Sequence, residues 1–269
     1  MGQDWSKRKR SRALVRHISP NFTNAIAYYF GSGPTDVAKS QIAHDEYVQA
    51  LREHGVDVHI LPGIENHPDC CFVEDAAIIV EDKVVVPHMG HESREGEQKE
   101  VKQYLSSHLQ VIIPPNGARM DGGDVMFFDD RLLVGLSSRT NKAGTEFLRG
   151  VASTLGFGIM EFEIPESTLH LSTVCSSPRP GTILAAEGHL KPEQFKPLVD
   201  EGFELLWVPN EEAYAANTIG FENDRVLISD NYPQTRALLE DVGFEVTTID
   251  MEHIRAADGS LTCLSLFYE

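Results

Sequence analysis

The chain has 269 residues, 41% of them hydrophobic, and a formal net charge of -18. This length and apolar fraction allow a sizeable core in one domain or in two small ones, and no apolar run reaches the ~18 residues of a membrane-spanning helix. The acidic balance argues against a nucleic-acid-binding protein, which needs a basic face. It is compatible with a small cationic ligand, which an acidic cleft would attract.

The cysteine content indicates the redox environment. Four cysteines with no repeated spacing do not form the framework of a disulfide-rich domain. The N-terminus is polar and basic, so no secretory signal is visible. We therefore expect a cytoplasmic protein whose thiols stay reduced and available for chemistry.

The first twelve residues carry a charge opposite to that of the rest. Five Lys or Arg residues against Asp4 give residues 1–12 a net charge of +4, which leaves -22 for the remainder. Gly2 followed by Ser6 fits the pattern for N-terminal myristoylation, and an acyl chain beside a basic patch would allow reversible membrane anchoring. The alternative is a solvated, disordered tail. We assign residues 1–12 to such a tail and 13–269 to a single folded domain.

One pattern recurs along the chain: the end of an amphipathic helix, then a glycine, then a strand. It occurs around Gly55, Gly156, Gly202 and Gly243, and a fifth copy at 104–113 lacks the glycine. A glycine in this place is typical of a helix that ends in the left-handed region, with the next strand starting directly after it.

Two short strands divided by an acidic turn precede most of these helices. In chain order the predicted pairs are 76–80 with 83–86, 125–128 with 131–135, and 218–221 with 225–229. Each unit is thus a strand, a turn, a strand, a helix and a strand. Recurrence every ~40–50 residues indicates repeated modules and not one doubly wound sheet.

Four modules run in sequence, and the fifth must be assembled from both ends of the chain. It would combine the strand 13–18, the helix 36–54 and a C-terminal strand that carries Cys263. Closing a ring in this way removes an open sheet edge. The predicted fold class is therefore α/β, a ring of five modules around a pseudo-five-fold axis, where the inner strands converge.

Three residues at predicted strand edges form the minimum set for nucleophilic catalysis by cysteine. They are Cys263, His170 and Asp121, the last beside glycines that allow close backbone approach. Each has a structural alternative: a cysteine in a core strand, a hydrogen-bonded core histidine and an ordinary acidic turn.

Other charged residues fit a guanidino ligand. The carboxylates of Asp69, Glu74 and Asp75 would suit a guanidinium, which is planar, always charged and rich in donors. A solvated acidic loop is the alternative. Arg139 could bind a carboxylate through two hydrogen bonds or brace the next helix.

Two segments have spacings that resemble metal sites. The run His88-Met-Gly-His91-Glu92 does not follow the order of the known zinc-binding helices. The pair Cys70-Cys71 near His67 lacks the spaced cysteines of a structural zinc site. We interpret both as loops and expect no metal.

Several segments, in this order, resemble those of the dimethylarginine dimethylaminohydrolases. The segments are 71–75, 121–125, 134–141, 169–171 and 261–263, and the likeness covers nearly the whole chain. That family belongs to the guanidino-group modifying enzymes, whose fold is a five-bladed α/β propeller of ββαβ units. The resemblance thus implies a single catalytic domain over residues 13–269.

The resemblance also implies a role for each of several residues. Cys263 would be the nucleophile, His170 the general acid and base, and Asp121 the carboxylate that works with it. The implied substrate-binding residues are Asp69 for the α-amino group, Glu74 and Asp75 for the guanidinium, Arg139 for the α-carboxylate, and Phe22 in the N-terminal loop over the site. One position departs from the family: His88 stands where an arginine usually helps to bind the carboxylate, which leaves the substrate tail open.

The activity implied is the hydrolysis of dimethylarginine to citrulline and dimethylamine through a covalent cysteine thiouronium, without a metal or organic cofactor. The alternatives are a deiminase or amidinotransferase acting on another guanidine, or a non-catalytic guanidino-binding protein. The expected partner is a small guanidino molecule and no nucleic acid. A membrane partner is expected only if Gly2 is acylated, and a homodimer is possible.

Overall fold

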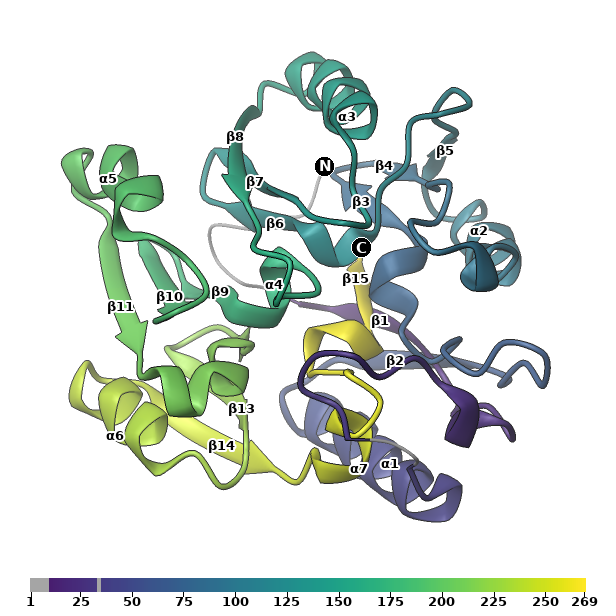
Figure 1. Ribbon diagram of the computed structural model, residues 1–269, viewed down its shortest axis with the longest axis horizontal. Coiled ribbons are helices and arrows are strands. Elements are labelled where there is room, and N and C mark those ends of the chain that lie inside the picture. Colours follow the sequence, from purple (N-terminus) through teal and green to yellow (C-terminus); the bar gives the residue numbers. More distant parts are fainter. Residues whose placement is uncertain (1–9, 33–34) are drawn as a thin grey trace.

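Five three-stranded sheets surround a common axis in the residues that the computed structural model describes, 10–32 and 35–269 (Figure 1). In every sheet the middle strand is antiparallel to the strand on one side and parallel to the strand on the other. The parallel pairs are joined through helices α1, α2, α3, α5 and α6, which lie at the rim. The predicted five-bladed α/β ring is confirmed.

The elements of each unit follow the order strand, strand, helix, strand. The second and third units are β3 (Ile78–Val80), β4 (Lys83–Val85), α2 (Gln98–Leu105) and β5 (Gln110–Ile112), then β6 (Val125–Phe128), β7 (Arg131–Leu136), α3 (Lys142–Thr154) and β8 (Gly158–Glu163). The fourth and fifth are β9 (Cys175–Arg179), β10 (Thr182–Ala186), α5 (Pro192–Asp200) and β11 (Glu204–Val208), then β12 (Ile219–Gly220), β13 (Arg225–Ser229), α6 (Pro233–Asp241) and β14 (Glu245–Ile249).

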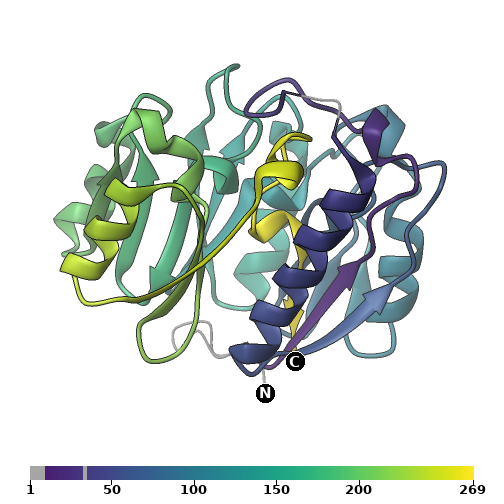
Figure 2. The ribbon, with the colours of Figure 1, turned by 90° about the horizontal axis from the view of Figure 1, so that it is seen from below.

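The remaining unit joins the two ends of the described chain, as the sequence predicts. It contains β15 (Leu266–Tyr268), β1 (Arg12–Arg16), α1 (Val37–Glu53) and β2 (Asp57–Leu61). Strand β15 pairs antiparallel with β1, with Tyr268 opposite Arg12 and Leu266 opposite Leu14. Figures 1 and 2 show the two strands side by side.

The start of the chain differs from the predicted boundary. Arg12 is the first residue of β1, and Arg10 donates from Nε to the Gly220 carbonyl at 2.9 Å, so residues 10–12 belong to the fold. The predicted acylation pattern at Gly2 lies outside the described residues.

Local signals explain where the helices end. The four predicted glycines follow α1, α3, α5 and α6, and all adopt left-handed backbone angles, with φ of 87° at Gly55, 85° at Gly156, 97° at Gly202 and 96° at Gly243. Helix α1 begins after Asp36, whose side chain accepts a hydrogen bond from the Lys39 backbone at 3.0 Å.

A short helical turn precedes the first strand of every unit. The turns are η3 (Val73–Ala76), η5 (Gly122–Asp124), α4 (Leu171–Val174), η6 (Asn210–Ala216) and η7 (Thr262–Leu264). The first strands of neighbouring units contact one another, β15 with β3, β6 with β9 and β9 with β12. The five turns therefore meet near the axis, although they are spread over 190 residues of sequence.

The prediction that Cys263 belongs to the C-terminal strand is wrong in detail. Cys263 lies in η7, and the strand starts at Leu266. The run from Leu261 to Tyr268 is apolar enough to be a strand throughout. However, the side chain of Asn217 accepts a hydrogen bond from the Thr262 backbone at 3.1 Å, which favours the turn.

The sequence does not predict β9. The strand reads Cys-Ser-Ser-Pro-Arg, and serine and proline are depleted in strands. It is buried up to Pro178, and Ser176 satisfies its hydroxyl by donating to the Ala216 carbonyl at 2.6 Å. Contacts with the neighbouring unit thus compensate for a weak local preference.

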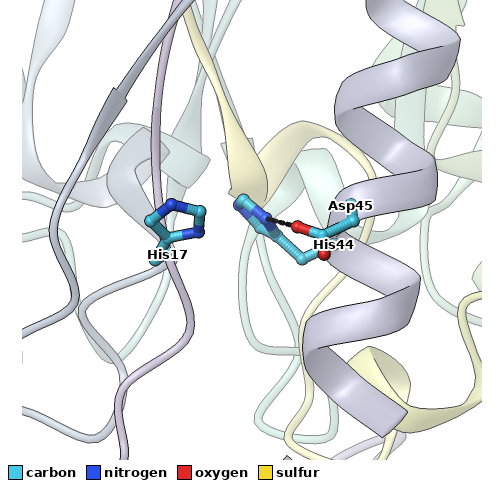
Figure 3. Close-up of side chains that lie close together, drawn as sticks. All are labelled: His17, His44 and Asp45. Carbon is cyan, nitrogen blue, oxygen red and sulfur yellow. Dashed lines mark ion pairs between the residues drawn. The ribbon is translucent and has the colours of Figure 1, made fainter. Parts of the chain in front are cut away.

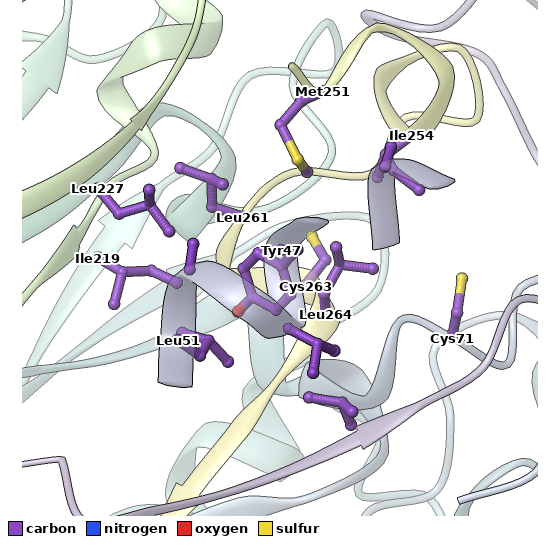
Figure 4. Close-up of a cluster of buried hydrophobic side chains, with 14 of the residues drawn as sticks. Tyr47, Leu51, Cys71, Ile219, Leu227, Met251, Ile254, Leu261, Cys263 and Leu264 are labelled. Carbon is purple, nitrogen blue, oxygen red and sulfur yellow. The ribbon is translucent and has the colours of Figure 1, made fainter. Parts of the chain in front are cut away.

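Apolar side chains fill the space between the sheets and the rim helices. In Figure 4, Cys263 packs in a cluster with Leu261 and Leu264, next to Tyr47 of α1. The Tyr47 hydroxyl donates to Ser265 Oγ at 2.7 Å, which ties α1 to the segment after η7. Of the helices in the described part of the chain, none combines the length and apolarity that a bilayer crossing requires.

Two glycines allow a test of how tightly neighbouring units pack. A Cβ at Gly220 of β12 would lie 1.8 Å from the Pro178 carbonyl oxygen of β9, whereas one at Gly243 would meet no atom within 4 Å. Gly220→Ala should therefore lower the free energy of unfolding by about 3 kcal/mol or more. Gly243→Ala should cost only about 1–2 kcal/mol of left-handed backbone strain. Urea denaturation measures the loss of unfolding free energy in each variant. Equal losses would mean that neighbouring units do not pack tightly at Gly220.

Candidate active site

A narrow cavity lies where the turns meet. Its lining residues are Ile26, Asp69, Phe72, Asp75, Arg94, Arg139, Leu169, His170, Ala257, Asp258, Gly259 and Cys263. It holds about 340 Å³ of empty space, open solvent included. Most of its polar lining groups carry a charge.

The structure brings together five of the nine residues that the sequence singled out. Cys263, His170, Asp69, Asp75 and Arg139 all line this cavity. Asp121 lies behind His170 and bonds to it. Glu74, Phe22 and His88 do not line it.

His170 and Asp121 form a buried pair. His170 Nε2 lies 3.1 Å from Asp121 Oδ2, and the carboxylate also accepts from the Gly90 backbone at 2.7 Å and from Arg139 Nη1 at 3.0 Å. Burial would raise the pKa of Asp121, but the hydrogen bond and charge of His170, with nearby arginines, hold it well below its usual range. Asp121 is therefore a fixed anion that orients the imidazole.

The environment of His170 favours its protonated form. Burial alone would lower its pKa, but the charge of Asp75 and the hydrogen bond with Asp121 outweigh burial and raise it to about 9. Nδ1 lies 3.7 Å from Asp75 Oδ1 and has no hydrogen-bond partner among the described residues. At neutral pH the ring is thus a cation that can give up a proton.

Asp75 is held by Arg94, a residue that sequence reasoning left without a role. The guanidinium bonds to Asp75 Oδ2 through Nη1 and to Glu97 Oε2 through Nε at 3.0 Å and Nη2 at 2.8 Å. Arg94 is buried, so its charge is matched by two carboxylates. In the sequence, the spacing Arg94-x-x-Glu97 was the feature that could have indicated an ion pair. The second oxygen of Asp75 accepts from the Gly123 backbone at 3.1 Å, so a ligand would have to share this carboxylate.

Cys263 is held as a neutral thiol. It is 4% exposed, and its Sγ lies 3.2 Å from Ser260 Oγ. Burial raises the pKa of the thiol well above its usual value, and the charges of Glu74 and Asp75 raise it further. A cation in the cavity would oppose both carboxylate charges and lower this pKa.

Glu74 faces away from its neighbour Asp75. It lines a second cavity, with about 870 Å³ of empty space including open solvent, that shares no lining residue with the first. Its Oε2 accepts from Thr262 Oγ1 at 2.9 Å and from Ser172 Oγ at 3.3 Å. Burial, followed by the charge of Asp75, raises the pKa of Glu74 to about 7. Glu74 therefore acts on Cys263 through its charge and through Thr262.

Phe22 and His88 lie outside the lining. Phe22 is buried edge-on against Phe72, which does line the cavity, with ring centroids 5.8 Å apart. His88 is half-buried, with Nε2 3.2 Å from the Pro114 carbonyl oxygen. Two residues later, a Cβ at Gly90 would lie 2.6 Å from Arg139 Cα. The segment of His88 thus contacts the site through its backbone.

Two carboxylates hold residues 26–31 over the cavity. Ile26 donates from its backbone to Asp69 Oδ1 at 3.0 Å, and burial raises the pKa of Asp69. The backbone amides of Tyr28, Tyr29 and Gly31 all donate to Asp258. No pattern in the sequence indicates a role for Asp258.

Asn217, which sequence reasoning also missed, connects two of the turns. Its Nδ2 donates to the Ser172 carbonyl at 2.7 Å and to Thr262 Oγ1 at 2.9 Å. It is fully buried and directly follows η6. Asn217 therefore fixes the turn that carries Cys263 relative to the turn that follows His170.

Asp75, Asp121 and His170 have ligand atoms within 4.8 Å of one another, close enough to hold a metal ion. However, both carboxylates already pair with arginines, Asp75 with Arg94 and Asp121 with Arg139. These fixed positive charges oppose a further cation at this point.

A five-unit ββαβ ring with charged side chains at its axis defines the class of α/β propellers that modify guanidino groups. The profile of the family described as "N,N dimethylarginine dimethylhydrolase, eukaryotic" matches residues 32–266. The chain belongs to the dimethylarginine dimethylaminohydrolase family.

Individual relatives agree with this assignment. The chain is 31% identical to the N(G),N(G)-dimethylarginine dimethylaminohydrolase of Pseudomonas aeruginosa over 238 residues, covering 87% of this chain and 90% of that protein. It is 29% identical to the Streptomyces coelicolor protein of the same name over 259 residues, covering 95% and 96%. The solved structure of a cysteine-to-serine variant of the Pseudomonas aeruginosa protein, complexed with citrulline, superimposes with a TM-score of 0.87 at 28% identity, covering 96% of this chain and 99% of that one.

The raised pKa of Glu74 predicts a pH dependence of stability. Because its pKa is about 7 in the folded state and near 4.5 in the unfolded state, its contribution is fully present below pH 4.5 and is lost as pH rises through about 7. The stability of Glu74→Gln relative to the parent should therefore increase by about 1–3 kcal/mol between pH 4.5 and 7.5.

Urea denaturation across that pH range measures the change. The control is Glu166→Gln, at an exposed glutamate, which should follow the parent at every pH. Parallel curves for Glu74→Gln and the parent would show that Glu74 ionises normally in the folded protein.

Proposed function

We propose that this protein hydrolyses a substituted guanidine, with N-omega,N-omega-dimethyl-L-arginine as the substrate and citrulline and dimethylamine as the products. The observation that carries the proposal is the axial cavity, where a thiol and a protonated imidazole face buried carboxylates. The named activities of the Pseudomonas aeruginosa and Streptomyces coelicolor relatives support the same chemistry.

The cavity charges suggest how the thiol is activated. In the free protein, burial and two carboxylates keep Cys263 protonated, while His170 is already an imidazolium. The imidazole therefore cannot accept the thiol proton. Binding of a guanidinium beside Asp75 would stabilise the thiolate, and the proton would leave to solvent.

The covalent stage follows from these protonation states. The thiolate attacks the guanidinium carbon, which gives a neutral tetrahedral adduct. His170 donates its proton to the substituted nitrogen, the C–N bond breaks, and dimethylamine leaves with a cationic thiouronium remaining on Cys263. Because Asp121 is a permanent anion, it stabilises the imidazolium before this transfer.

Hydrolysis restores the enzyme. The neutral His170 now takes a proton from water, and the resulting hydroxide attacks the thiouronium carbon. The C–S bond then breaks as the adduct's hydroxyl proton is lost to solvent, which releases the neutral ureido product and the thiolate, with one water consumed per turnover. The thiolate regains a proton from solvent when the product leaves. The segment held by Asp69 and Asp258 would limit the entry of further water.

Arg139 is the proposed ligand of the substrate carboxylate. Among residues 10–32 and 35–269 its side chain makes one hydrogen bond, from Nη1 to Asp121, so Nη2 and Nε can bind a ligand. Asp69, at the same cavity, would attract the α-amino group. The proposed roles of Glu74 and His88 are indirect, since Glu74 lines the other cavity and His88 bonds to Pro114.

A substrate panel tests the proposed activity. Dimethylarginine, monomethylarginine, arginine, agmatine and guanidino acids would each be incubated with the protein, and products identified by mass spectrometry. Citrulline with dimethylamine supports the proposal. Ammonia released from arginine in preference would indicate a deiminase, and amidino transfer to an added amine would indicate a transferase. No turnover of any guanidine would contradict the enzyme proposal.

The nucleophile can be tested separately. Cys263→Ser should bind dimethylarginine with little change in affinity, since the cavity carboxylates remain, but should lose turnover by about a thousandfold or more. Calorimetry measures binding and citrulline assays measure turnover. Cys175→Ser, at a buried thiol outside the axial cavity, is the matched control and should retain activity. Substantial hydrolysis by Cys263→Ser would exclude the covalent scheme.

Activation by a bound cation predicts a preference between two alkylating agents of equal size. Chloroacetamidine is cationic at neutral pH and chloroacetamide is neutral. The rate of alkylation by the cationic reagent is divided by the rate for the neutral reagent, first with glutathione and then with Cys263. This rate ratio should be about tenfold higher or more for Cys263, because the cation offsets the carboxylate charges. Peptide mass spectrometry locates the label. An equal rate ratio for Cys263 and glutathione would mean that the charges of Asp75 and Glu74 do not stabilise a cation next to the thiol.

A further inference from the structure

A second cluster of potential ligands lies outside the axial cavity, between β1 and α1 (Figure 3). His17 directly follows β1, and His44 and Asp45 are adjacent on α1. One potential ligand atom from each of the three residues lies within 4.8 Å of the other two. In Figure 3, His44 reaches from the helix toward His17, with ring centroids 5.8 Å apart.

The hydrogen bonding of His44 is incomplete. The residue is 0% exposed, and neither of its ring nitrogens has a hydrogen-bond partner among the described residues. Asp45 Oδ1 is 3.9 Å from Nδ1, which is too far for a hydrogen bond. Leaving a buried donor or acceptor unpaired is unfavourable. A bound ligand at a ring nitrogen would remove part of that free-energy cost.

The other two residues are held in place near His44. Gln41 Nε2 donates to Asp45 Oδ1 at 2.8 Å and lies 3.3 Å from His17 Nδ1. His44 and Asp45 follow Gln41 by three and four residues on α1, so each lies beside Gln41 on the helix surface. The side chain of Gln41 therefore contacts both of the more exposed members and keeps them beside the buried one.

We propose that His17, His44 and Asp45 form a binding site for a divalent transition-metal ion, and that the ion is Zn²⁺. Two imidazole nitrogens and one carboxylate oxygen are ligands that Zn²⁺ accepts in tetrahedral sites, with water as a fourth. Imidazole suits zinc, copper and nickel, whereas calcium and magnesium prefer oxygen. The Asp45 side chain is 63% exposed, which gives the ion an entry path and leaves room for the water.

The position of the site gives it a structural role. His17 directly follows β1, before residues 26–31, which Asp69 and Asp258 hold over the axial cavity. His44 and Asp45 lie in α1. An ion bound to all three residues would tie the end of β1 to α1. Zinc at this site should therefore stabilise the fold without taking part in the chemistry at Cys263.

The test uses full-length, untagged, metal-free protein in the Cys263→Ser background, which removes the thiol of the axial cavity. Titration with zinc chloride in a calorimeter should show one equivalent bound. Adding His17→Asn or Asp45→Asn should weaken zinc binding by more than about tenfold. Removing a residue that binds the metal lowers the affinity more than removing one that only supports such a residue. Glu46→Gln is the matched control: it removes a neighbouring exposed charge and should leave the affinity unchanged.

Two further readouts make the result decisive. Cobalt chloride should give the visible absorption of tetrahedral Co²⁺, and this absorption should be lost in the His17→Asn variant. Zinc should raise the melting temperature of the Cys263→Ser protein but not of its His17→Asn derivative. The proposal is overturned if no zinc binds. It is also overturned if His17→Asn and Asp45→Asn bind zinc as tightly as their parent. That second result would place the bound ion elsewhere, such as at Asp75, Asp121 and His170.

Discussion

The short pairing between β15 and β1 is the constraint on which the site depends. Three residue pairs join these strands across more than 250 residues of sequence, and Cys263 lies three residues before the first of them. The bonds from Tyr47 to Ser265 and from Asn217 to Thr262 fix the intervening turn from two sides. Asp75 lies in η3 and His170 directly precedes α4, which are equivalent turns of other units, so closing the ring brings these residues and the thiol together.

Much of the fold could be predicted because its signals are local and repeat. Glycines such as Gly156 and Gly243 mark helix ends, and acidic turns such as Asp129-Asp130 divide the strand pairs. The predictions of secondary structure were wrong where contacts between residues distant in sequence determine the local conformation. The C-terminal run looks like one continuous strand until Asn217 binds Thr262, and β9 is held by its neighbours although its sequence is unfavourable for a strand.

The candidate site was predictable to a smaller extent. Chemistry-bearing residues in recognisable segments, such as Cys263 and His170, were found because the residue types and the family resemblance agree. Asp258 and Asn217 were missed because each bonds to partners that are distant in sequence. Arg94 was missed because its spacing to Glu97 does not reveal that Asp75 lies beside it. Nor could the sequence tell that Glu74 and its neighbour Asp75 face different cavities, since η3 sets which way each carboxylate points.

The same closure has a consequence for how the protein is made. A ribosome releases β1 early, but its partner β15 emerges only after all four other units have been synthesised. Until then β1 presents an unpaired edge, which is a template for aggregation, and the contact that removes it is among the longest in the chain. During synthesis His170 and the cavity carboxylates thus emerge before Cys263, and the proposed chemistry requires residues 262–268 to have left the exit tunnel.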